Sequence, residues 1–422
     1  MPSAVLDLAS VLALVVMLVV AFVHPKGWVE TLVGLGAAGL VGALGAVTYA
    51  EASAEVRQLF PVVAFLAAIL VVAEICSVEG VFSAVGSIVA HASRHRPLRM
   101  LALTFVAAAV TTAVRSLDAT VVLLTPVVAA AATSTMVSPR PVVYACVRLA
   151  NSASLLLPVS NLTNLLALPS LHLSFVRFAL VMAPVWVVTI GVEYVGHRLF
   201  FACDLGSRPG DGTFRREERL PVVPLVVVGL MLVGFAVASP LGVAPAWVAA
   251  AAAVVLAAYS LARRQVTPRA VLRATHVSFS VFVLCLGVVV ASLADTFLGD
   301  AVSALVPGAD GLAGLLVLAL LATALANLVN NLPATLLLVP LVAPLGVTAL
   351  LATLVGLNVG SSLTYTGSLA NLLWRRSLIR HGAHPSARTF HLLSAAVTLP
   401  AVAVATVTLW AWAAVCGHLG WL

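Results

Sequence analysis

Uncharged polar side chains gather in one short stretch of an otherwise apolar chain. Residues 357–374 have the sequence LNVGSSLTYTGSLANLLW, which contains no Asp, Glu, Lys or Arg. Amide and hydroxyl side chains both donate and accept hydrogen bonds, so such a stretch can bind a small polar solute without using charge. A second asparagine-rich stretch, LVNNLPATLL, lies shortly before it at 328–337. We expect these stretches to form part of a binding site.

Both stretches have counterparts in the first half of the chain. The sequence NSASLLLPVSNLTNLL at 151–166 aligns without a gap with 358–373, and SLDATVVLLTP at 116–126 resembles NLPATLLLVP at 331–340. The aligned polar pairs are Asn151 with Asn358, Ser154 with Ser361, and Asn164 with Asn371. A chance match of two Ala- and Leu-rich helices would explain the leucines but not these pairs. We therefore favour an internal repeat, which is common in transporters.

These polar stretches are expected to interrupt helices at membrane depth. Unwound backbone is tolerated there only where it is buried in protein or lines a wet cavity. Helix ends at a break direct N–H groups and partial positive charge inward, so two breaks related by a pseudo-two-fold axis would make a central site. The alternative is that the small residues only help helices to pack. The candidate substrate-binding residues are Asn151, Ser154, Asn161, Thr163, Asn164, Asn327, Asn330, Asn331, Asn358, Ser361, Thr364, Ser368 and Asn371.

The elements that must position these residues are membrane helices. Of the 422 residues, 62% are hydrophobic and 9% are charged, against about 25% charged in a soluble domain. The high hydropathy argues against a barrel of alternating strands. We expect an all-α integral membrane protein with about 10–12 transmembrane helices in two inverted repeats. Residues 1–200 and 220–422 are the expected repeats, and 201–219 is the expected cytoplasmic basic linker.

The distribution of arginine predicts the orientation in the membrane. Arginines concentrate in four connections, at 94–99, 198–219, 263–273 and 375–388, whereas 295–310 contains three aspartates and no Arg or Lys. By the positive-inside rule, the four basic connections lie in the cytoplasm. This pattern accounts for the net charge of +7 without a nucleic-acid partner.

Charged residues within apolar sequence are candidates for proton coupling. Asp118 lies inside the first-half repeat motif, three residues after Arg115. A charge at the bilayer centre costs about 2.5–3.5 kcal/mol on insertion scales, which makes such residues functional candidates. We therefore consider Asp118, with Arg115, and Glu74, while a static Arg115–Asp118 pair on one helix turn is the alternative. Glu193 is expected to mark the cytoplasmic end of its helix.

Motifs for other chemistries are missing from the sequence. The five cysteines are spread singly without a CxxC, and there is no Walker A loop, GxGxxG or GxSxG. We expect no metal site, no cofactor and no enzymatic activity. A membrane-embedded enzyme would need a metal-ligand cluster or a nucleophile–base pair, and neither is evident.

At the polar clusters the chain resembles the ArsB-type arsenite permeases (arsenical pump membrane proteins) of the ion transporter superfamily. The matching segments are LVNNLPATLL (328–337), NVGSSLTYTGSLANLLW (358–374), LDATVVLLTP (117–126) and SNLTNLL (160–166). The sequence departs from the family pattern at Tyr365, where proline is expected, and at Ser-Leu-Asp (116–118), where Asn-Asp is usual.

This resemblance implies an ion transporter superfamily fold, in which each repeat has a re-entrant hairpin and an interrupted helix. It implies a scaffold part and a moving transport part in the plasma membrane. It also implies export of arsenite and antimonite by proton antiport, in some systems with a soluble ATPase partner. The alternatives within the superfamily are a sodium/proton antiporter and a carrier of silicate or dicarboxylate anions. No Arg or Lys lies inside the polar clusters to meet a carboxylate, but helix N-termini could substitute.

Overall fold

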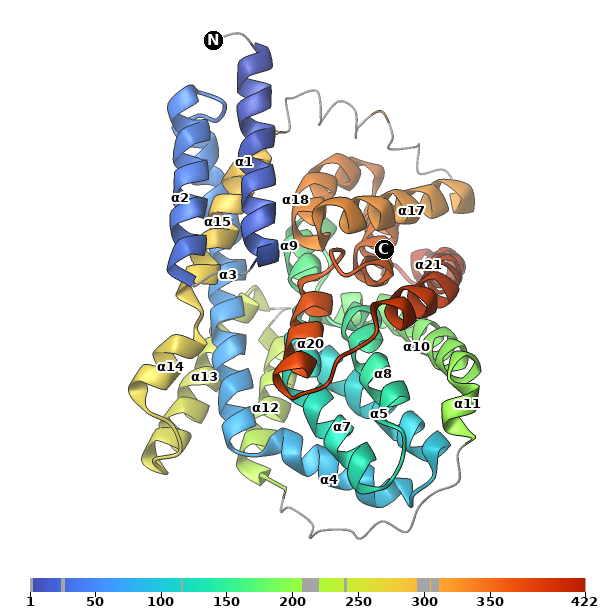
Figure 1. Cartoon of the computed structure of the whole chain (residues 1–422). Helices are drawn as coiled ribbons and strands as arrows, with labels where there is room; N and C mark the ends of the chain where they lie inside the picture. The colour runs from blue at the N-terminus through green and yellow to red at the C-terminus, as the bar shows by residue number, and fades with distance from the viewer. Residues whose placement is uncertain are drawn as a thin grey trace.

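The computed structural model shows helices joined by turns and short loops (Figure 1). It describes residues 3–23, 27–114, 117–206, 220–238, 241–293, 304 and 311–421, and these contain no strand. Seven of the described helices are long and apolar enough to cross a membrane. The all-α membrane fold is therefore confirmed.

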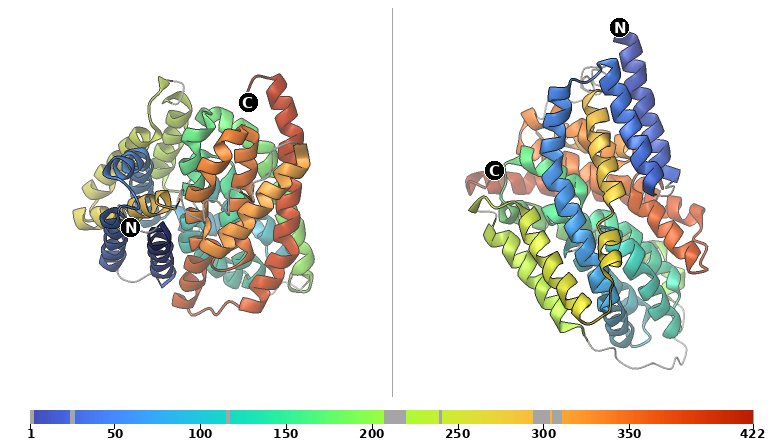
Figure 2. Two further views of the ribbon diagram at one scale, coloured as in Figure 1. Left: turned by 90° about the horizontal axis from the view of Figure 1, so that it is seen from above. Right: turned by 90° about the vertical axis from the view of Figure 1, so that its left-hand side faces the viewer.

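One set of helices, here called the lateral group, lies on the left of Figure 1 and in front in the right-hand view of Figure 2. It contains α1 (Ser3–Val23), α2 (Gly27–Leu44), α3 (Tyr49–Val78), α12 (Val222–Ala238), α13 (Pro245–Ala262), α14 (Pro268–Ala274) and α15 (Val277–Ala291). Helix α3 packs against α13, α14 and α15, and α2 packs against α1 and α15. A capping box begins α3: Glu51 N donates to Thr48 Oγ1 at 3.3 Å, and Thr48 N donates to the Glu51 carboxylate at 2.8 Å.

The remaining helices form the site group, on the right of Figure 1. They are α4 (Val81–Ser93), α5 (Pro97–Val114), α6 (Leu117–Ala119), α7 (Thr125–Ser134), α8 (Pro139–Ser152), α9 (Leu162–Leu171), α10 (Phe175–Phe200), α11 (Ala202–Leu205), α17 (Gly311–Val329), α18 (Asn331–Val342), α19 (Val347–Asn358), α20 (Leu369–Arg380) and α21 (Ala387–His418). The long helices α10 and α21 pack along each other, and α17 packs on α18, α19 and α21. Because both groups contain helices from both halves of the sequence, the predicted repeats interleave in space.

Each half contains one interrupted helix, as predicted. Residues 153–161 separate α8 from α9 and are called the first break, and residues 359–368 separate α19 from α20 and are called the second break. Both breaks consist of short 3₁₀ turns and extended residues. In the first break, Pro158 helps to stop the helix because proline lacks the N–H that a continued helix requires.

A helical hairpin accompanies the second break. Helices α17 and α18 turn back at Asn330, whose φ of +76° lies in the region that few residues other than Gly and Asn adopt. Asn331 N donates to the Gly367 carbonyl of the second break at 3.0 Å. In the first half, Ser160 Oγ donates to the Ala113 carbonyl of α5 at 2.6 Å. The α17–α18 hairpin is thereby held to the second break, and the end of α5 is held to the first.

Close packing of α19 and of the second break on α17 depends on glycine. A side-chain carbon at Gly356 would overlap the Ala319 carbonyl, and one at Gly360 would overlap the Thr323 side chain. Glycine allows the two backbones to approach, as small residues do between membrane helices.

Two of the arginine-rich connections lie at the same end of the molecule. The α4–α5 and α13–α14 connections carry Arg94, Arg96, Arg263 and Arg264 and lie at the lower end in Figure 1, whereas α1 begins at the upper end. This arrangement is what the positive-inside rule requires. The cytoplasmic assignment of that end stays a prediction.

Candidate functional site

Six of the predicted residues meet in a buried amide network between the two breaks. They are Asn151, Ser154, Asn164, Asn358, Ser361 and Asn371, all 0% exposed. Asn151 Nδ2 donates to Asn371 Oδ1 at 2.8 Å, and Asn358 Nδ2 donates to Asn164 Oδ1 at 2.7 Å. Each half therefore gives one amide hydrogen bond to the other, as expected of two repeats around a pseudo-two-fold axis.

The hydrogen bonds inside the two breaks also repeat. Ser154 Oγ donates to the Asn151 carbonyl at 2.7 Å, and in the second half Ser361 Oγ donates to the Asn358 carbonyl at 2.8 Å. Asn164 Nδ2 donates to two carbonyls of the first break at 2.8 and 3.1 Å, and Asn371 Nδ2 does the same in the second at 3.0 and 2.8 Å. All these bonds keep the predicted register, which is therefore confirmed.

Beside this network, three helices begin at one cavity. Asn161, Asn330 and Ser368 cap α9, α18 and α20, and each side-chain oxygen accepts from the N–H two residues later, at 3.3, 3.3 and 3.2 Å. Asn161 and Ser368 occupy equivalent repeat positions and have the same backbone conformation, with φ and ψ of −146° and 143° against −145° and 143°. The first turns of α9 and α20 each keep a further N–H for a ligand, at Leu162 and Leu369. In α18 the N–H groups of the first turn are bonded within the protein, and this end contributes only its partial positive charge.

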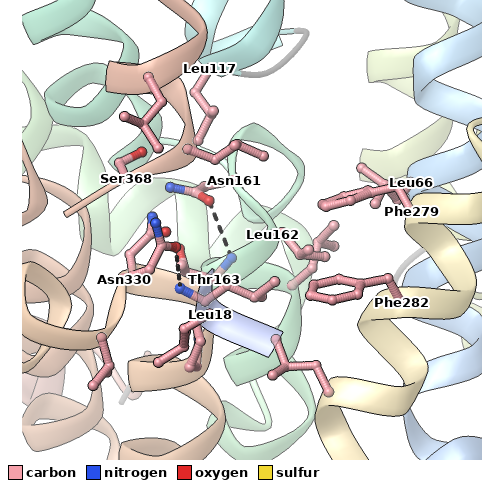
Figure 3. A pocket seen from close by; sticks show the side chains of 18 of the residues that line it. Leu18, Leu66, Leu117, Asn161, Leu162, Thr163, Phe279, Phe282, Asn330 and Ser368 are labelled. Carbon is pink, nitrogen blue, oxygen red and sulfur yellow. Dashed lines mark hydrogen bonds between the residues drawn. The ribbon is translucent and has the colours of Figure 1, made fainter. Parts of the chain in front are cut away.

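The cavity has a volume of about 310 Å³ and lies between the lateral group and the site group. Figure 3 shows its two unlike walls, with Leu66, Phe279 and Phe282 opposite Asn161 and Asn330. The polar residues that line it are Asn161, Thr163, Asn330, Asn331, Thr366 and Ser368. Its described lining contains no charged side chain. The arrangement suits a solute with one apolar and one hydrogen-bonding side, or an anion held by helix ends.

Asn331 stands out among the lining residues because its amide is not committed. The residue is 6% exposed, and within the described part of the chain its side chain has no hydrogen-bond partner. Its amide atoms are not fully enclosed by protein and face the cavity, where a ligand can bond them. Ser368 offers a second donor, since its hydroxyl oxygen accepts from Ala370 N while the O–H remains.

Asn161 and Thr163 connect the cavity to the amide network. Asn161 Nδ2 and Thr163 Oγ1 both donate to Asn358 Oδ1, at 2.7 and 2.6 Å. Asn358 does not line the cavity, and neither do the other five network residues. The six network residues support the cavity wall. Their polar groups bond to one another, to carbonyls of the breaks, and to Asn161 and Thr163.

Hydrogen bonds between Asn327 and Thr364 join α17 to the second break. Asn327 Oδ1 accepts from the backbone N and the hydroxyl of Thr364 at 2.9 and 2.8 Å. Its Nδ2 donates to the carbonyls of Thr323 and Gly360 at 2.7 and 2.9 Å. With all four bonds used within the protein, Asn327 holds the break against α17.

The structure describes the predicted proton-coupling residues only in part. Arg115 and the side chain of Asp118 lie outside the described residues, but Leu117, adjacent to Asp118, lines the cavity. Glu74 is exposed on α3 and is not among the residues that line the cavity.

One buried ion pair was not predicted from the sequence. Arg148 and Glu193 are 1% and 0% exposed, and Arg148 Nη2 lies 2.6 Å from Glu193 Oε1. The expectation that Glu193 marks a cytoplasmic helix end is wrong, because the side chain is enclosed by α8 and α10. The available signal was a lone arginine in the apolar run just before Asn151.

Comparison with known proteins agrees with a transporter. The family profile of citrate transporters, CitMHS, matches residues 4–350. The crystal structure of the YdaH transporter of Alcanivorax borkumensis, described as having an unusual topology, is similar with a TM-score of 0.55 and 17% sequence identity, covering 86% of this chain and 87% of that chain. At this identity the similarity shows the fold alone. No curated protein matches the chain. The expected ion-transporter character is confirmed, while the specific resemblance to arsenite permeases is not shown.

Proposed function

The chain belongs to the citrate transporter family and is a secondary transporter, and we propose that it carries a small carboxylate anion. The observation that carries this proposal is the polar wall of the cavity, where three capped helix N-termini meet the uncommitted amide of Asn331.

The size of the cavity supports an organic anion. Its volume of about 310 Å³ is at the lower end of the range of about 300–1,000 Å³ found for small-molecule pockets. A di- or tricarboxylate of citrate size uses such a volume, whereas trihydroxy arsenic, with one arsenic and three oxygen atoms, fills only a small part of it.

The electrostatics of the wall also support an anion. A helix N-terminus stabilises a nearby negative charge by about 0.3–1 kcal/mol, and by up to about 2 kcal/mol in a partly buried geometry. Three such ends contribute about 1–6 kcal/mol together. The Asn331 amide and the Ser368 hydroxyl add donors, which carboxylate oxygens accept. An anion site without arginine or lysine is therefore physically reasonable.

Export of arsenite and antimonite is the second candidate. The observation that favours it is the charge-free lining, since a neutral trihydroxy solute both donates to and accepts from amides and hydroxyls. The two candidate solutes differ in charge. A negative charge introduced into the cavity wall therefore distinguishes them, because it repels only the anion.

Proton coupling remains part of the proposal for either solute. Asp118 is the first candidate for the coupling group because its neighbour Leu117 lines the cavity. Glu74 follows, since it lies exposed on α3.

The test uses purified protein in liposomes loaded with citrate, succinate or arsenite, with labelled solute outside. Asn331→Leu should raise the citrate concentration for half-maximal uptake at least about tenfold, because a hydrogen bond to a charged group contributes about 1.5–3 kcal/mol. Asn331→Asp should raise it by at least about a hundredfold, because two like charges about 4 Å apart repel by about 4 kcal/mol at an effective dielectric constant of 20.

Ser174→Ala is the matched control. Ser174 caps α10, accepting from Arg177 N at 3.2 Å, and it does not line the cavity. Loss of this cap costs about 1 kcal/mol of helix stability. The citrate concentration for half-maximal uptake should stay unchanged. If the wild type exchanges arsenite but neither carboxylate, and Asn331→Asp leaves arsenite exchange intact, the arsenite candidate replaces the carboxylate proposal.

A further inference from the structure

A fully buried ion pair joins helices of the site group behind the cavity. Arg148 of α8 and Glu193 of α10 are 1% and 0% exposed. Arg148 Nη2 and Nε donate to the two Glu193 carboxylate oxygens at 2.6 and 3.0 Å. Ser152, next to Asn151 of the amide network, donates to Glu193 Oε1 at 2.7 Å. The pair is therefore attached to the end of α8, just before the first break.

The other side of the guanidinium reaches the second break and α21. Arg148 Nη1 donates to Thr398 Oγ1 at 2.7 Å, and to Ser394 Oγ and the Ser362 carbonyl at 3.4 Å each. Ser394 Oγ donates to the same Ser362 carbonyl at 2.8 Å. Ser362 belongs to the second break, so one side chain of α8 fixes this break both directly and through α21.

Among the described residues of the second half there is no equivalent ion pair. In the register that aligns Asn151 with Asn358, Arg148 aligns with Val355 and Ser152 aligns with Val359. Helix α21, which follows the second break as α10 follows the first, contains no Asp or Glu. The same architecture is thus built once with apolar side chains and once with buried charges. Because burying an ion pair is often less favourable than packing apolar residues, the fold alone does not account for it.

We propose that the Arg148–Glu193 pair is a positioning device that fixes the second break relative to α8. The second break carries Thr366 and Ser368 of the cavity wall, so the pair sets the geometry of one side of the site. This role rests on the proposed substrate site between the breaks, but its test needs no substrate. The proposal predicts an unequal effect on two breaks that are otherwise bonded alike.

The experiment measures amide hydrogen exchange of the full chain in lipid nanodiscs, with peptides that separate residues 153–161 from 359–368. The test variant is Arg148→Val/Glu193→Leu, which makes the pair apolar as in the other half and leaves no unpaired charge. Amides of 359–368 should exchange about tenfold faster or more, because hydrogen bonds from a charged donor are lost. Amides of 153–161 should change by less than about twofold, because the pair reaches the first break only through the Ser152 hydroxyl, which can turn to another acceptor.

Arg140→Leu is the control on the same helix. Arg140 has a side chain that is 56% exposed and lies 3.7 Å from Asp204, outside the network, and its loss should leave exchange in both breaks unchanged. If the double variant does not fold, Ser394→Ala/Thr398→Val keeps the ion pair, removes its contacts with α21 and should still accelerate 359–368 selectively.

The proposal would be overturned if a folded variant showed unchanged exchange rates in 359–368, or equal acceleration in both breaks. The ion pair would then contribute only packing and would not position the second break. A wild type that carries no carboxylate would remove the proposed substrate but leave the exchange result, so the two failures are distinguishable.

Discussion

Replacement of Asn358 by leucine tests the amide network most directly. Asn358 is 0% exposed. Its Oδ1 accepts from Asn161 Nδ2 at 2.7 Å and from Thr163 Oγ1 at 2.6 Å, and its Nδ2 donates to Asn164 Oδ1 at 2.7 Å. Leucine has a similar size, so Asn358→Leu removes three hydrogen bonds without leaving a large cavity. We expect the variant to insert into the membrane but to lose transport, because two of the released groups belong to the cavity wall.

The cost in stability follows from the partners left behind. A buried polar group without a partner costs about 1–3 kcal/mol, which gives about 3–9 kcal/mol for three. The lower half of this energy range applies, because two of the three groups can still be paired. Asn161 Nδ2 keeps a bond to Ser154 Oγ at 3.2 Å, and the Thr163 hydroxyl can rotate to another acceptor. We expect about 3–5 kcal/mol. With an unfolding entropy of about 2 cal/mol/K per residue over 422 residues, this lowers the melting midpoint by about 3–6 °C.

The assay is thermal unfolding of detergent-solubilised protein, followed by solute exchange in liposomes. Thr353→Val is the matched control on the same buried helix, because its hydroxyl bonds only to the Ala349 carbonyl one turn earlier, at 3.0 Å. That carbonyl keeps its helical bond, so the change should cost less than about 1 kcal/mol. Asn151→Leu should also stop transport but destabilise less, since its Oδ1 accepts only one bond of 3.4 Å, from Ser361. Normal transport in both variants, or a larger loss of stability for Asn151→Leu, would refute the reasoning.

Two further predictions concern coupling and packing. Asp118→Asn keeps the shape of the side chain but cannot titrate, so solute exchange should continue while uptake driven by a pH gradient disappears; full gradient-driven uptake would exclude Asp118 as the coupling group. Gly360→Ala places a methyl group against the side chain of Thr323 and should cost about 1–3 kcal/mol by overpacking, seen as a lower folded yield. Gly39→Ala, in an open part of α2, should instead be neutral or stabilising by up to about 1 kcal/mol, and equal yields for the two would contradict the packing argument.

Several features of the protein follow from the sequence itself. The apolar runs require helices, because a bilayer offers no partner to an unpaired backbone group. The gap-free alignment of 151–166 with 358–373 identified both interrupted helices and their register. The register could be predicted because each break satisfies its carbonyls with its own serine and asparagine, at short sequence separations. Local bonds of this kind leave a local pattern.

Only the tertiary structure decided which polar groups are used within the protein and which face the cavity. Asn358 and Asn331 are both asparagines in polar stretches, yet the first is enclosed by partners and the second is uncommitted at the cavity. The partner amides lie 194 to 220 residues away, and Glu193 lies 45 residues from Arg148. These pairings arise because packing of the two halves brings particular helix faces together, and a single sequence carries no local signal of which face will meet which.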